Sequence, residues 1–157
     1  MLAKYIAAFL ISMVPVLELR GALPIAMGMG IPTAQAYIVC VLGNILPVPF
    51  IYLFARKVLI WGSEKRYVGK FCTFFLEKGE RAGRKLVATT GRYGMFVALM
   101  LFVGIPLPGT GAWTGAMAAS FLDLGIKTTT AAAGLGVIIA GVIMAAASAG
   151  VFSIIGL

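Results

Sequence analysis

The segregation of charged residues constrains the fold of this chain more than any other feature of its sequence. Ten of the thirteen Lys and Arg residues, and three of the five acids, lie between residues 56 and 92, which therefore carry +7 of the net charge of +8. A soluble domain has about 25% charged residues distributed along its length, whereas 11% are charged here and 61% are hydrophobic. We predict a small all-α integral membrane protein that forms a single membrane domain over residues 1–157. The remaining 120 positions contain only five charged residues: Lys4, Glu18, Arg20, Asp123 and Lys127.

Two uncharged stretches are long enough to cross a bilayer as helices. Residues 33–55 provide 23 uncharged positions and residues 128–157 provide 30, and about 20 suffice to span the membrane. Asn44, Pro47 and Pro49 predict a kink and an interhelical hydrogen bond in the first span. Small residues spaced four apart in the second span predict close helix packing, which makes a homodimer conceivable.

Shorter apolar stretches precede each of these spans. Residues 5–17 are apolar over 13 positions, about 20 Å of helix and too short to cross, and residues 21–31 form a comparable return arm. We therefore predict a re-entrant hairpin with its tip at residues 17–21. Residues 93–122 follow the same plan with a tip at residues 105–111. Two alternatives remain at this stage: every apolar stretch spans, with the amino terminus inside, or the first stretch is a secretory signal peptide.

The two halves of the chain resemble each other when they are shifted by 90 residues. A hairpin plus one span makes an odd number of crossings, so the two halves must have opposite orientations. We therefore predict two inverted repeats, residues 1–55 and 93–157, each a re-entrant helical hairpin plus a transmembrane helix. Transporters of this design hold their substrate near the bilayer midplane. The shift gives five identities, pairing Leu17 with Leu107, Gly21 with Gly111, Ala22 with Ala112, Ala26 with Ala116 and Met27 with Met117.

The basic connector between the halves, residues 56–92, is predicted to be cytoplasmic, because loops rich in Lys and Arg stay inside the cell membrane. Apolar residues recur within it at steps of three and four, interleaved with basic residues. Residues 64–90 are thus predicted to form an amphipathic helix on the inner leaflet, with membrane lipids and in particular anionic headgroups as partners. A solvated connecting helix is the alternative. Neither reading requires nucleic acid as a partner.

Glu18 and Arg20 are the only ionisable residues at either predicted tip. Charges within a membrane are costly, and this makes both residues functional candidates. A desolvated Glu18 is a candidate proton carrier, while the fixed donors of Arg20 suit phosphate or another anion. In the structural alternative, the two residues form an ion pair that pins the tip.

The second tip combines helix breakers with polar groups. Pro106 and Pro108 remove helical hydrogen bonds, and the glycines that follow allow a tight turn whose amides can face a ligand. The sequence has no His and only two isolated cysteines, so we predict no metal site, no cofactor and no enzymatic activity. Trp113 is expected either as a pocket wall or as an interfacial anchor. The candidate proton- and substrate-binding residues are Glu18, Arg20, Gly21, Asn44, Pro106, Pro108, Gly109, Thr110, Gly111 and Trp113.

Three motifs resemble the family of small multidrug export proteins. They are ELRGALP at residues 18–24, GN at residues 43–44 and IPLPGTGAW at residues 105–113. More distantly, the plan is similar to the DedA group, which is associated with proton-dependent movement of polyprenyl-phosphate lipids. That group carries an Arg after a Pro-Gly pair in its second hairpin, where this chain has Thr110.

Together, the tips and these resemblances imply a small proton-linked secondary transporter or lipid flippase. Its substrate would be a drug-like molecule or an anionic polyprenyl-phosphate lipid. One alternative is a membrane scaffold that transports nothing. Another is a four-helix antiporter of cationic drugs and protons, but Arg20 disfavours a pocket for cations.

Overall fold

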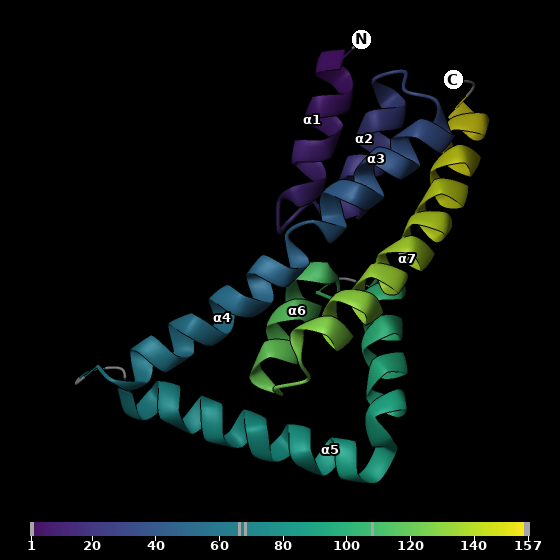
Figure 1. Cartoon of the computed structure of the whole chain (residues 1–157). Coiled ribbons are helices and arrows are strands. Elements are labelled where there is room, and N and C mark those ends of the chain that lie inside the picture. The colour runs from purple at the N-terminus through teal and green to yellow at the C-terminus, as the bar shows by residue number, and fades with distance from the viewer. Residues whose placement is uncertain (1, 66, 68, 108, 156–157) are drawn as a thin grey trace.

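The secondary structure of this chain is helical throughout the described residues. The computed structural model describes residues 2–65, 67, 69–107 and 109–155 (Figure 1), and all regular elements within them are α-helices, as predicted. The helices are α1 (Leu2–Met13), α2 (Glu18–Gly28), α3 (Thr33–Ile45), α4 (Val48–Ser63), α5 (Gly69–Gly104), α6 (Ala112–Phe121) and α7 (Ile126–Ile155).

Three helical stretches are long and apolar enough to cross a membrane: Thr33–Ser63, Gly69–Gly104 and Ile126–Val151. The first consists of α3 and α4, which are interrupted at Leu46 and Pro47, because proline has no N–H for the helical ladder. The predicted kink is therefore confirmed. The helical stretch continues past its predicted end at residue 55, so that α4 takes up the start of the basic connector. These three apolar stretches agree with the small helical membrane protein that the composition predicted.

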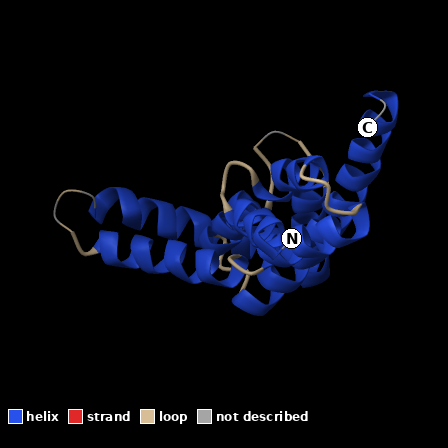
Figure 2. Ribbon diagram, turned by 90° about the horizontal axis from the view of Figure 1, so that it is seen from above, coloured by secondary structure: helices blue, strands red, loops and turns tan. Residues whose placement is uncertain are grey.

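The second stretch, α5, is broken at Gly91. This residue has φ 72° and ψ 168°, a conformation essentially restricted to glycine. Figure 1 shows α5 running along one end of the molecule and then turning back toward its middle. The part of α5 before the break, residues 69–90, is a helix within the range 64–90 for which an amphipathic helix was predicted. Figure 2 shows this part and α4 projecting together from the other helices.

The chain reverses direction twice near the middle of the molecule. The first turn, residues 14–17, joins α1 to α2, and the second turn, residues 105–111, joins α5 to α6. Within each pair the two helices contact each other. Both ends of the chain lie at one end of the molecule, and residues 69–90 lie at the other (Figure 1).

The carboxyl ends of α2 and α6 are capped in the same way. The N–H of Ile31 donates to the carbonyl of Ala26 (3.2 Å), and the N–H of Leu124 donates to the carbonyl of Ala119 (3.1 Å). Gly30 and Asp123 occupy the left-handed position of this cap, with φ 80° and 55°. These two caps lie 93 residues apart, close to the shift of 90 that gives the sequence identities.

The buried faces of α3 and α7 repeat at the same spacing. The buried residues of α3 are Ala36, Cys40, Val41, Gly43 and Asn44, and their counterparts Thr129, Ala133, Gly134, Gly136 and Val137 are buried in α7. A Cβ on Gly43 would overlap the carbonyl oxygen of Phe9, and a Cβ on Gly136 would overlap that of Met100. Each glycine thus lets a span approach the first arm of its own hairpin. The small residues Gly136 and Ala140, which suggested a homodimer, are buried within the chain.

Candidate functional site

The first and second turns meet at the centre of the fold, and Glu18 and Arg20 make the contacts between them. Glu18 is the first residue of α2 and has φ 47°. A positive φ is uncommon for a residue other than glycine and concentrates at functional or strained positions. Arg20 follows within the same helical turn, so both side chains come from the start of α2.

The guanidinium of Arg20 binds the second turn, residues 105–111. It donates to the carbonyl oxygen of Leu107, to that of Ile105 (3.3 Å) and to Oγ1 of Thr110 (2.8 Å). Both carbonyls also accept a backbone N–H within the same turn: that of Ile105 accepts from Leu107 (2.8 Å), and that of Leu107 accepts from Thr110 (3.2 Å). Arg20 therefore supplies further hydrogen bonds and a positive charge to the turn that follows α5.

The carboxylate of Glu18 binds the start of α6. Glu18 is 6% exposed, and its Oε1 accepts a hydrogen bond from the backbone N–H of Trp113 (3.1 Å). The first amides of a helix form the positive end of its dipole and favour an acidic partner. A Cβ on Gly111 would overlap this carboxylate, so the approach of Glu18 depends on glycine at that position.

Trp113 ties the two hairpins together a second time. Its indole Nε1 donates to the carbonyl oxygen of Met13 (3.0 Å), the last residue of α1. The junction therefore has three cross-hairpin connections, made by Glu18, Arg20 and Trp113. Glu18 and Trp113 each bind a backbone group at the end of a helix, where intrahelical partners are missing, whereas Arg20 binds carbonyls of the second turn.

Glu18 and Arg20 do not pair with each other. None of the ion pairs among the described residues joins them, so the predicted ion pair at the tip is not formed. The acid instead faces the positive end of α6, and the base faces carbonyl oxygens of the second turn. Two charges within a membrane protein thus find opposite partial charges on the backbone of the other hairpin.

A cavity of about 590 Å³ opens beside this junction. Its polar lining comes from Glu18, Arg20, Thr110 and Thr114, and its apolar lining includes Leu17 and Met144. Mostly apolar cavities with a few convergent polar groups are the usual form of small-molecule sites. The arrangement can therefore offer a carboxylate, a guanidinium and hydroxyls to one ligand.

The structure brings together most of the residues that the sequence singled out. Glu18, Arg20, Gly21, Pro106, Gly109 and Thr110 line the cavity. Gly111 and Trp113 instead contact Glu18 and do not belong to the lining. Pro108 lies outside the described residues.

Asn44 lies elsewhere, buried in α3. It is 3% exposed and does not line the cavity. Among the described residues its Oδ1 has no hydrogen-bond partner, so the interhelical hydrogen bond predicted for this oxygen is not observed there. The described residues also contain no group of three or more His, Cys, Asp or Glu side chains that could hold a metal ion.

One polar cluster was missed by the sequence interpretation. Arg56 of α4 forms ion pairs with Asp123 and with Glu80 (3.7 Å), and Tyr52 accepts a hydrogen bond from the N–H of Gly125 (3.0 Å). The only signal in the sequence was that Asp123 is a lone acid in an apolar stretch. Its partner could not be identified, because Arg56 is one of ten basic residues in the connector.

Comparisons with known proteins agree with this membrane architecture. A family profile described as "Putative small multi-drug export protein" matches residues 18–143. No curated protein and no solved structure matches the chain, and no comparison supports the more distant resemblance to the DedA group. The matched region begins at Glu18 and includes both arms of the second hairpin, so it covers the junction and most of both halves. The chain therefore belongs to the family of small multidrug export proteins, a membrane transport family.

Proposed function

We propose that this chain is a non-enzymatic, proton-linked secondary transporter or lipid flippase. Its substrate site is the cavity between the two turns. The observation that carries the proposal is the position of the buried Glu18 carboxylate, which lines a cavity of about 590 Å³ and also holds the first turn of α6. A change in its protonation would therefore alter its interactions both with a bound substrate and with the start of α6.

The proposal includes a membrane arrangement of two inverted repeats with re-entrant hairpins. The 12 residues of α1 and the 11 of α2 are too short to cross a bilayer that requires about 20. The equivalent caps of α2 and α6 support the repeat. In this arrangement the two turns lie near the midplane, where broken helices are tolerated only if they are buried or line a cavity. The basic connector lies on the cytoplasmic side of the cell membrane.

Protonation of Glu18 is the proposed coupling step. The ionised carboxylate makes a charge-assisted hydrogen bond to the N–H of Trp113. When Glu18 takes up a proton, the carboxylate loses its charge and its attraction to the positive end of α6 weakens. The second turn can then separate from the first and expose the cavity to the other side, where the proton is released.

Arg20 suits an anionic group on the substrate. A guanidinium has five N–H donors, and the contacts of Arg20 to the second turn use three acceptors. The remaining donors are available for a phosphate or carboxylate in the cavity. The family description names drug export, so a drug-like molecule and a polyprenyl-phosphate lipid are the two substrate classes to compare.

The test is proton flux in liposomes that contain the purified full chain and an entrapped pH-sensitive dye. Ethidium and undecaprenyl phosphate serve as the two probes. We expect one of them to drive proton movement through the wild type, and Glu18→Gln to abolish it at every pH. Gln keeps an oxygen acceptor for the Trp113 amide but cannot carry a proton. Glu77→Gln is the matched control, because Glu77 is exposed on the connector.

A scaffold function is the second candidate, since every side-chain hydrogen bond observed for Glu18 and Arg20 goes to the second hairpin. It predicts no flux with either probe in the wild type. Normal flux in Glu18→Gln at all pH values would instead show that Glu18 does not carry the proton, although the chain is still a transporter. Folding of each variant is checked by its thermal unfolding midpoint in detergent.

A further inference from the structure

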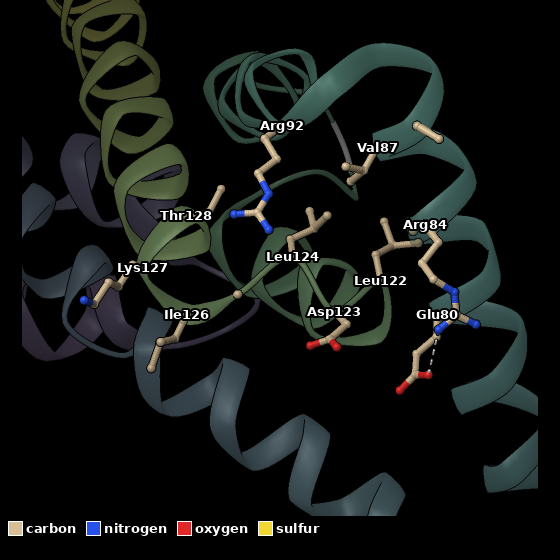
Figure 3. A pocket seen from close by; sticks show the side chains of 13 residues that line it. Glu80, Arg84, Val87, Arg92, Leu122, Asp123, Leu124, Ile126, Lys127 and Thr128 are labelled. Carbon is tan, nitrogen blue, oxygen red and sulfur yellow. Dashed lines mark ion pairs between the residues drawn. The ribbon is translucent and has the colours of Figure 1, made fainter.

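A second cavity lies at the end of the molecule formed by the basic connector. Its volume is about 730 Å³. It is lined by the part of α5 before the Gly91 break, by Arg92 directly after the break, by the loop between α6 and α7, and by the first turn of α7 (Figure 3). It is separate from the junction of the two turns, because the two cavities share no lining residue.

The acids of this cavity are already paired. Asp123 binds Arg56, and Glu80 lies between Arg56 (3.7 Å) and Arg84 (3.6 Å). These two acids and two arginines therefore balance in charge. Arg92 and Lys127 also line the cavity, and within the described part of the chain neither has an ion pair or a hydrogen bond from its side chain. The cavity thus has an excess of positive charge.

Arg92 is the residue positioned to use that excess. Figure 3 shows its guanidinium between the side chains of Leu124 and Thr128, while Arg84 turns toward Glu80 and Lys127 extends away on the other side of α7. A guanidinium presents a planar fork that matches phosphate oxygens in a bidentate manner. The first amides of α7 border the same space, and such amides have no partner within their helix.

Away from the charged groups, the walls of the cavity are apolar. Val87, Ala88, Leu122, Leu124 and Ile126 line it, and α7 continues from there as a candidate membrane span. A free phosphate ion would gain nothing from such walls. A ligand with a charged head and an apolar body would be served by both parts of the lining.

We propose that this cavity binds the phosphate group of one anionic phospholipid. Arg92 donates to the phosphate, Lys127 contributes positive potential at the rim, and the glycerol and upper acyl chain lie along the apolar wall. The proposal requires the connector to lie at the membrane surface but does not require transport. It also differs from a general attraction of the basic connector for anionic lipid, because a single place on the chain is responsible.

The test is native mass spectrometry of the full chain in neutral detergent, titrated with phosphatidylglycerol or phosphatidylcholine. We expect one saturable phosphatidylglycerol. Arg92→Gln should weaken it about tenfold, as the loss of a charge-assisted bidentate pair implies. Arg81→Gln is the matched control, because it removes the same charge from the exposed part of α5 outside the cavity. That variant should stay within about twofold of the wild type.

Equal weakening by the two variants would overturn the proposal, because it would show diffuse attraction. Equal binding of phosphatidylcholine would overturn it as well. Competition by inorganic phosphate at the same concentration as lipid would reassign the cavity to a free anion and likewise overturn it.

A second pair of variants covers the case in which Arg92→Gln does not fold. Ala88→Trp fills the cavity and keeps all charges, whereas Ala82→Trp adds the same bulk to an exposed position outside it. Only Ala88→Trp should lose the bound lipid. If both variants retain it, the lipid is bound elsewhere and the proposal is wrong.

Discussion

Glu18 and Arg20 both bind the other half of the chain, Glu18 at the start of α6 and Arg20 at the second turn. Arg20 reaches groups 85 to 90 residues away, and Glu18 reaches an amide 95 residues away. The sequence identified both residues because charges in an apolar stretch are costly. It could not identify their partners, since backbone carbonyls and amides leave no mark in a sequence. The close approach at Gly111 is likewise visible only in three dimensions.

The role of Gly111 can be tested against a neighbouring glycine. In Gly111→Ala the new Cβ overlaps the Glu18 carboxylate, and we expect a loss of about 3 kcal/mol in the free energy of unfolding, at the upper end for overpacking. In Gly109→Ala no atom lies within 4 Å of the Cβ, so only the left-handed φ costs energy, about 1 kcal/mol. Chemical unfolding in detergent micelles measures both. Equal losses would mean that the Glu18 side chain moves aside for the new Cβ at little cost in free energy.

Asp123 shows how one residue can combine a local and a distant role. It stands at the left-handed cap position of α6, where the equivalent residue after α2 is Gly30. Glycine would suit that backbone better. Asp123 instead supplies a carboxylate that binds Arg56 of α4. The cap therefore fixes the connector end of the molecule as well as the end of a helix.

The helices pack through glycines where a span meets the first arm of its own hairpin. Gly43 of α3 faces α1, and Gly136 of α7 faces α5. The sequence predicted this close packing from the small residues of the second span without identifying the partner helix. The structure places Gly136 within the chain, because α7 runs beside α5.

Substitutions in α7 separate packing from helix propensity. In Gly136→Ala the Cβ would lie 2.6 Å from the Met100 carbonyl oxygen and 2.7 Å from Cβ of Val103. We expect the free energy of unfolding to fall by about 2 kcal/mol. Gly150→Ala meets nothing within 4 Å and should raise it by up to about 1 kcal/mol, as alanine favours helix. Thermal unfolding in detergent distinguishes the two; a neutral Gly136→Ala would contradict the close approach of α7 to α5.

At the scale of the whole molecule, the hairpins place both termini at one end and the connector at the other (Figure 1). Because most of the basic residues lie in the connector, the positive-inside rule predicts that the connector end of the molecule faces the cytoplasm. If the hairpins are re-entrant, the chain crosses the bilayer with α3–α4 and with α7 only. In the alternative arrangement every apolar stretch spans. The two arrangements differ in the side of the membrane on which the ends of each hairpin lie.

Cysteine labelling measures those sides. In a background with Cys40 and Cys72 replaced, single cysteines are placed at Leu2, Thr33, Glu64 and Lys127. We expect a membrane-impermeant maleimide to label positions 2 and 33 in intact cells, and positions 64 and 127 only in inverted vesicles. The positive-inside rule gives this sidedness for the connector. Labelling of position 2 from the cytoplasmic side would rule out the re-entrant first hairpin.

The sequence by itself determined the class of this protein and where its chemistry concentrates. A chain with so few charges outside one segment can only bury its apolar surface in lipid. Proline and glycine mark the breaks, because their effects are local. The tertiary structure decided the rest: the matching caps of α2 and α6, the pairing of Arg56 with Asp123, the binding of the start of α6 by Glu18 and the binding of the second turn by Arg20. These depend on contacts between residues distant in the chain, whose distances are set by how the helices pack.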